Sequence, residues 1–142
     1  MKIYNQLNLL VALFLGGLFL ISCAAKKEEQ KLLYDEVMKV HDEVMPDMGK
    51  LMGLSKQLKG KAITLSLDST NTVSQEQAKV YAGLAIDLEV ANEQMMSWMR
   101  NFELVEESTP HEEAMIYLKK ELIAIQKVRD AMNLASAKAE AA

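Results

Sequence analysis

The stretch that decides the fold is MIYLKKELIAIQKVRDAMNLA, residues 115–135. Its apolar residues recur every three or four positions, which places them on one face of a helix. The seam that they form consists of Met115, Leu118, Leu122, Ile125, Val128, Met132 and Ala135. The stretch therefore predicts an amphipathic helix whose apolar face packs against other helices.

The residues on either side of this stretch predict where the helix begins and ends. Thr109 is suited to cap the helix, and Glu112 would complete a capping box with it. Pro110 is suited to the first helical position, where its missing N–H does no harm. The alanine-rich residues 137–142 are expected to form a frayed helical tail.

A long first helix is expected from about residue 28 to residue 67. Its apolar seam reads Tyr34, Met38, His41, Met45, Met48 and Met52, with a flanking row at Leu33, Val37, Val40, Val44 and Leu51. Pro46 lacks the N–H that would bond the carbonyl of Asp42, so a kink is expected just before it. Gly60 costs about 1 kcal/mol relative to alanine and could break the helix. Apolar and polar residues alternate over residues 63–67, which would permit a short strand. A single strand would have no partner in this chain, so a helix is favoured.

A second helix is expected after the polar turn at residues 68–72, and it runs to about residue 104. Ser74 with Gln77 fits a capping box, and Val73 facing Ala78 fits a hydrophobic staple. Three helices joined by two short connections predict an all-α fold, an antiparallel three-helix bundle with a long, Pro-kinked first helix.

Turns near residues 70 and 107 predict which residues of the three helices lie at the same level of the bundle. His41 then lies level with Arg100 and Ala114, and Met45 with Met96 and Leu118. Most methionines would share one half of the bundle with Trp98 and both histidines. The other half would be lined by Leu58, Leu65, Leu84, Leu88, Ile125 and Val128.

An apolar run at residues 9–21 ends in Leu20-Ile21-Ser22-Cys23. The run is shorter than the ~20 residues of a membrane-spanning helix, and it suits the core of a secretory signal. The four residues resemble the bacterial lipobox, at which lipoproteins are lipidated on cysteine and cut just before it. The resemblance implies that residues 1–22 are removed, with cleavage between Ser22 and Cys23, and that Cys23 becomes a lipidated N-terminus. An ordinary signal peptide or a short anchor helix with an incidental cysteine are the alternatives.

This reading divides the chain into four parts. Residues 1–22 are the lipoprotein signal peptide, residues 23–30 the lipidated cysteine and a charged tether, residues 31–136 the helical bundle, and residues 137–142 the tail. Ala24 is not the aspartate that holds many lipoproteins in the inner membrane, so the outer membrane is expected. Lys27-Glu28-Glu29 resembles the export signal of Bacteroidota surface lipoproteins, but a charged tether also serves solubility, so the periplasmic and surface faces both stay open.

The charge balance excludes two classes of partner. Removal of residues 1–22 takes away Lys2 and no acid, which changes the net charge from −4 to −5. An acidic chain is unsuited to nucleic acid and to electrostatic binding of anionic lipid, so the covalent lipid has to supply the membrane anchor. Because Cys23 is the only cysteine, no disulfide is expected.

A group of soft ligands lies on one face of the first helix. Met38, His41 and Met45 are spaced three and four apart, and Trp98 and Met99 are expected at the same level of the bundle. Thioether and imidazole groups select Cu(I) or Ag(I) over harder ions. The simpler interpretation is that methionine fills irregular core space near the proline kink, and that His41 is satisfied by a neighbouring carboxylate such as Glu43 or Asp42.

Sequence patterns typical of enzymes are missing. A di-iron bundle carries Glu-x-x-His on two helices, but the residues three before His41 and His111 are Met38 and Ser108. There is no His-Glu-x-x-His zinc signature, no glycine-rich phosphate loop and no cysteine left over as a nucleophile. We therefore expect no enzymatic activity and no cofactor, with copper as the alternative.

Two segments carry a resemblance to a known group of proteins. They are LYDEVM (33–38) continued by HDEVMPDM (41–48), and Trp98-Met99-x-x-Phe102. With these segments the chain resembles small uncharacterised Bacteroidota lipoproteins, often labelled "viral A-type inclusion protein". The resemblance implies a location in the cell envelope and a helical architecture, and it implies no catalytic residues. The expected function is that of a non-enzymatic, lipid-anchored binding or structural module with an envelope protein as partner. Carriage of a small molecule or lipid between the helices stays open, with no dedicated residue behind it.

Overall fold

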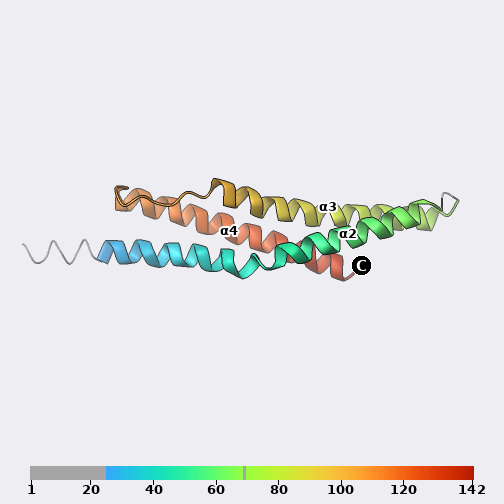
Figure 1. Cartoon of the computed structure of the whole chain (residues 1–142), viewed down its shortest axis with the longest axis horizontal. Helices are drawn as coiled ribbons and strands as arrows, with labels where there is room; N and C mark the ends of the chain where they lie inside the picture. The colour runs from blue at the N-terminus through green and yellow to red at the C-terminus, as the bar shows by residue number, and fades with distance from the viewer. Residues whose placement is uncertain (1–24, 69) are drawn as a thin grey trace, which may run out of the picture.

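The computed structural model describes residues 25–68 and 70–142, and within these residues it is built from helices without strands. A helical segment covers residues 25–44, and it is followed by α2 (Asp47–Ser66), α3 (Thr72–Asn101) and α4 (His111–Glu140). The helices lie side by side along the length of the molecule (Figure 1). The predicted all-α bundle with a long, bent first helix is confirmed. The signal peptide with its cleavage site, Ser22 and Cys23, lies outside the described residues.

The first helix bends at Met45 and Pro46, where it is interrupted for two residues. The backbone of Pro46 keeps helical angles, with φ −61° and ψ −27°. The Met45 N–H still donates to the His41 carbonyl at 3.0 Å, but the Met48 N–H reaches only three residues back, to the Met45 carbonyl at 3.3 Å. The missing proline N–H therefore produces a kink and not an end, as the sequence predicts. Gly60 lies within α2 and does not break it.

Up to Leu51, the buried face of the first helix is the flanking row and not the predicted seam, since it buries Val37, Val40, Val44 and Leu51. Further along, Ser55, Leu58 and Ala62, which continue the helical spacing of the seam, are buried. The predicted seam residues Met38, Met45 and Met48 are only half-buried, and Met52 is 44% exposed. The two rows are adjacent on the helix, so helical spacing alone did not distinguish the row that points inward from the one beside it.

The predicted caps of α3 and α4 are wrong. α3 begins one residue after Asn71, whose side chain accepts hydrogen bonds from the backbone N–H groups of Val73 at 3.0 Å and Ser74 at 3.2 Å. Val73 is 75% exposed and forms no staple. Pro110 directly precedes α4, and no side chain caps that helix. Asparagine at the cap accepts the same N–H groups that a serine would, so the turn had two candidate caps.

The connection between α3 and α4 shifts the register of the bundle. Residues 102–106 are non-helical, and an extended residue advances about twice as far as a helical one. Phe102 consequently packs against Tyr117, and Asp87 pairs with Lys138. These partners lie roughly one to three turns further along α4 than a tight turn near residue 107 would put them. The pairing of the first helix with α3 is close to the prediction, because His41 lies against Trp98.

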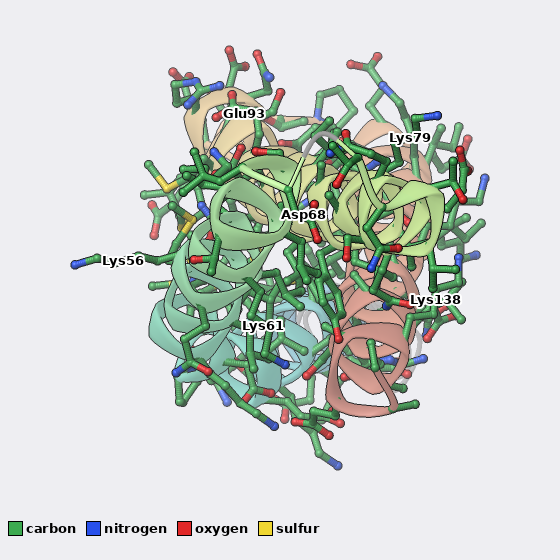
Figure 2. The ribbon with its side chains drawn as sticks, turned by 90° about the vertical axis from the view of Figure 1, so that its right-hand side faces the viewer. Lys56, Lys61, Asp68, Lys79, Glu93 and Lys138 are labelled. Atoms are coloured by element: carbon green, nitrogen blue, oxygen red, sulfur yellow. The ribbon has the colours of Figure 1, made fainter. Side chains whose placement is uncertain are left out.

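α4 stops before the far end of the molecule, so α2 and α3 continue as a two-helix hairpin (Figure 1). The Tyr81 hydroxyl donates to the backbone oxygen of Ala142 at 3.4 Å, which places the end of α4 beside the first third of α3. We call the part beyond this point, residues 62–80, the tip. Figure 2 looks at the molecule from this end, with Asp68 of the tip near the centre of the view.

The C-terminal residues are not the frayed tail that the sequence predicts. α4 continues to Glu140, and Ala139 is only 7% exposed. Glu140 forms an ion pair with Lys50 of α2, with 2.5 Å between Oε1 and Nζ. The register shift explains this, because it brings the last turn of α4 onto α2.

One continuous core runs through the part where three helices overlap. Its largest fully buried side chains include Leu51, Leu88, Met95, Leu118, Ile125 and Met132. Ile125 and Val128, which the sequence places in the leucine half, belong to the same cluster as Trp98 and Val37. No helix in the described ranges combines the length and the apolar character needed to cross a membrane.

Candidate functional site

Aromatic rings from all three long helices meet in the half of the bundle that contains residue 25. The His41 ring lies 5.8 Å from the Trp98 ring, and Trp98 stacks on Phe102 at 4.8 Å. Phe102 in turn lies 6.1 Å from Tyr117 and 6.2 Å from Tyr34. The sequence places His41 and Trp98 together correctly. It missed the other three rings, which only the non-helical connection after Asn101 brings into contact.

His41 is held by its neighbour in sequence. Its Nδ1 lies 2.8 Å from Oδ1 of Asp42, and 17% of its side chain is exposed. This confirms the predicted carboxylate partner. One ring nitrogen is therefore occupied, and the ring face is packed near Trp98.

The other proposed copper ligands are present at the same level but none is fully enclosed. Met45 and Met99 are partly buried against the core, and Met38 is half-buried. Trp98 is 8% exposed, and its buried Nε1 has no hydrogen-bond partner within the described residues. The His, Cys, Asp and Glu side chains that the structure describes form no group of three or more that could hold a metal ion.

His111, the second histidine, joins the N-terminal helical segment to α4. Its Nε2 lies 3.4 Å from Oε2 of Glu29, while its Nδ1 is buried without a partner among the described residues. The two histidines are thus held by different carboxylates on different elements. The structure does not combine them into one site.

A polar network ties α2 to α3 near the middle of the molecule. The Ser55 hydroxyl, itself buried, donates to Oε1 of Glu89 at 2.9 Å, and the Lys59 ammonium contacts the same oxygen at 2.5 Å. These two hydrogen bonds hold the pKa of the Glu89 carboxyl below its ordinary value, the contact with Lys59 contributing most. Sequence reasoning did not find this network, because a serine at a core spacing looks like any small residue.

A cavity lies at the opposite end from the tip, where the connection between α3 and α4 passes the N-terminal helical segment. Its volume is about 380 Å³, and Tyr34, Leu104, Val105 and Leu118 supply its apolar lining. Lys27 and Lys31 lie at the same cavity. No sequence signal indicated it, since the cavity depends on the register of α4.

No protein-family model, no curated protein and no solved structure matches the chain.

Proposed function

We propose that the chain is a non-enzymatic, lipid-anchored protein of the bacterial envelope that acts as a helical binding module for another envelope protein. The anchor in this proposal is Cys23, at the end of the apolar run and lipobox-like residues. A multiply acylated cysteine suffices to hold a protein in a membrane, because each buried CH₂ contributes about 0.8 kcal/mol. The resemblance to Bacteroidota lipoproteins supports the outer membrane as its location, on either face.

The observation that carries the proposal is the elongated shape with its anchor end and its tip. Residues 25–66 span about 60 Å at 1.5 Å per helical residue. The residue that would carry the lipid lies two positions before one end, and exposed apolar residues lie at the other. Leu67 is 80% exposed, Val73 75% and Ile63 64%. A rod of this kind holds a binding surface away from the membrane.

The anchor is tested by replacing Cys23. The Cys23→Ser variant should lose acylation, keep its signal peptide and differ in mass from the processed parent. Metabolic labelling with an alkyne fatty acid measures acylation, and mass spectrometry measures the mass of the protein. Equal mass and equal labelling in parent and variant would contradict the anchor.

A second candidate function, Cu(I) or Ag(I) binding, is favoured by one observation, the approach of His41 to Trp98. Leucine keeps the approximate volume of methionine, and such exchanges cost below about 1.5 kcal/mol. A Met38→Leu, Met45→Leu variant should therefore stay folded under either proposed function. If copper binding is the function, this variant should also lose Cu(I) affinity, measured by competition with a Cu(I) chelator.

The chain offers a matched control for that experiment in its exposed methionines, Met52 and Met96. Our expected result is that the parent binds Cu(I) no more tightly than micromolar. Submicromolar binding that falls in the Met38/Met45 variant, and not in a Met52→Leu, Met96→Leu variant, would make copper binding the function.

A further inference from the structure

The cavity at the end opposite the tip has the size of a small-molecule site. Its volume of about 380 Å³ falls in the range of ligand pockets, ~300–1,000 Å³. Its walls come from three places in the chain, the N-terminal helical segment, the connection between α3 and α4, and the first turns of α4. A cavity between three segments, open to solvent at one side, contacts a ligand from more than one element.

The connection after Asn101 forms one wall of the cavity. α3 ends at Asn101, and Phe102 is held between the rings of Trp98 and Tyr117. The Glu103 N–H donates to the Tyr117 hydroxyl at 2.7 Å, which fixes the next residue as well. Leu104 and Val105 follow in non-helical backbone at the cavity wall, and Leu104 is left 73% exposed.

The walls combine an apolar surface with cationic groups at one side. Leu104 and Val105 supply aliphatic surface, while Leu118 behind them is fully buried. Lys27 and Lys31 are four residues apart and share a helix face. In a chain of net charge −4, this cavity is lined by two lysines and one acid, Glu107.

The two lysines differ in how they are engaged. Lys31 donates to the Asp35 carboxylate at 3.2 Å, one turn along the same helix. Lys27 forms no ion pair within the residues that the structure describes. An anionic group in the cavity would therefore find its cation in Lys27.

We propose that this cavity binds a single-chain amphiphile with a carboxylate head, a fatty acid. The chain lies on Leu104, Val105 and the Tyr34 ring, and the carboxylate reaches the Lys27 ammonium. The inference is independent of the proposed anchor, because it rests on residues 27–118 and not on Cys23.

A photoactivatable fatty acid tests the site in the full-length chain. Lysate of a bacterium expressing the protein is freed of ATP and coenzyme A, so that the diazirine-bearing alkyne probe stays a free acid. After irradiation, labelled peptides are identified by mass spectrometry in the soluble and membrane fractions. We expect saturable labelling of peptides that contain Tyr34 or Leu104, competed by the unlabelled acid and much less by its methyl ester.

Matched variants distinguish binding in the cavity from non-specific binding of the probe to apolar or charged surface. Leu104→Gln should lower labelling several-fold, because it removes exposed apolar surface from the cavity wall, while Leu67→Gln at the tip should not. Lys27→Glu should lower it as well, and Lys79→Glu in α3 should not. If Leu104→Gln destabilises the fold, the comparison of Lys27→Glu with Lys79→Glu still tests whether the probe binds in the cavity.

Three outcomes would overturn the proposal. One is labelling that does not saturate or that falls equally in both members of each pair. Another is equal competition by the acid and its methyl ester, which would remove the carboxylate from the argument. The third is stronger labelling of the same peptides by a phospholipid carrying the same photoactivatable chain, which would assign the cavity to membrane lipid.

Discussion

The part of the molecule where three helices overlap and the two-helix tip are held together by different interactions. In the three-helix part, large side chains such as Leu88, Met95 and Ile125 are fully buried. In the tip the buried side chains are Ala62 and Ala78, at 8% and 7% exposure. Alanine removes little apolar surface from water, so hydrophobic burial contributes much less to the tip.

Polar contacts close the tip instead. The Gln75 side-chain amide donates to the backbone carbonyls of Ser66 at 3.2 Å and Asp68 at 2.8 Å, and Asn71 caps α3. Just below them, the Lys61 ammonium lies 5.0 Å from the centre of the Tyr81 ring. The comparison shows that one pair of helices can continue past its third partner when caps and side-chain amides replace a packed core. Such a segment opens locally at a lower free energy than the core.

The largest difference between the two regions is expected from truncating one apolar side chain in each. Ile125→Ala should lower the free energy of unfolding by about 2–5 kcal/mol, because the cavity it leaves is enclosed by three helices. Leu65→Ala in the tip should cost less, since Leu65 is only half-buried. Urea denaturation followed by circular dichroism measures both, and equal losses would show that the tip carries a packed core after all.

A smaller effect is expected from the cap of α3. Asn71→Ala should lower the free energy of unfolding by about 1 kcal/mol, because two backbone N–H groups lose their acceptor. Ser74→Ala, which changes the cap that the sequence favoured, should have little effect. Hydrogen exchange should also show faster opening of residues 72–80 in the Asn71 variant. A greater loss for Ser74→Ala would restore the sequence-based cap.

The interaction between α2 and α3 below the tip should depend on pH. Because Lys59 and Ser55 hold the Glu89 pKa below its ordinary value of 4.5, the folded state is stabilised above that pH. The contribution is lost as the pH falls through the lowered pKa of the folded protein. Melting temperatures should therefore drop more steeply below pH 4.5 in the parent than in Glu89→Gln. Glu76→Gln, whose partner Lys79 lies in the same helix, serves as control and should follow the parent.

Local chemistry explains which parts of the fold could be predicted. The missing N–H of Pro46 fixes the bend, and helical spacing fixes the three long helices, so both follow from sequence. The pairing of His41 with Trp98 follows from the short turn near residue 70. Each of these depends on a few neighbouring residues or on one tight turn.

The register of α4 could not be predicted in the same way. It depends on Phe102 leaving the helix to stack between Trp98 and Tyr117, a contact between residues far apart in sequence. The position of the C-terminal turn beside Lys50 and the cavity at Leu104 both depend on that displacement. The choice between the methionine row and the valine row of the first helix likewise depends on where α3 and α4 lie around it.

The smallest effect on stability, and the most informative one for function, is expected at the exposed apolar residues of the tip. A Leu67→Gln, Val73→Gln variant should change the free energy of unfolding by less than about 0.5 kcal/mol, because both side chains are exposed by three quarters or more. If the tip is the binding surface, this variant should lose proteins that the parent retains in a pull-down from detergent-solubilised envelope. Ile116→Gln, Leu134→Gln removes the same kind of surface from α4 and should retain them. The same proteins retained by both variants would place binding elsewhere on the rod.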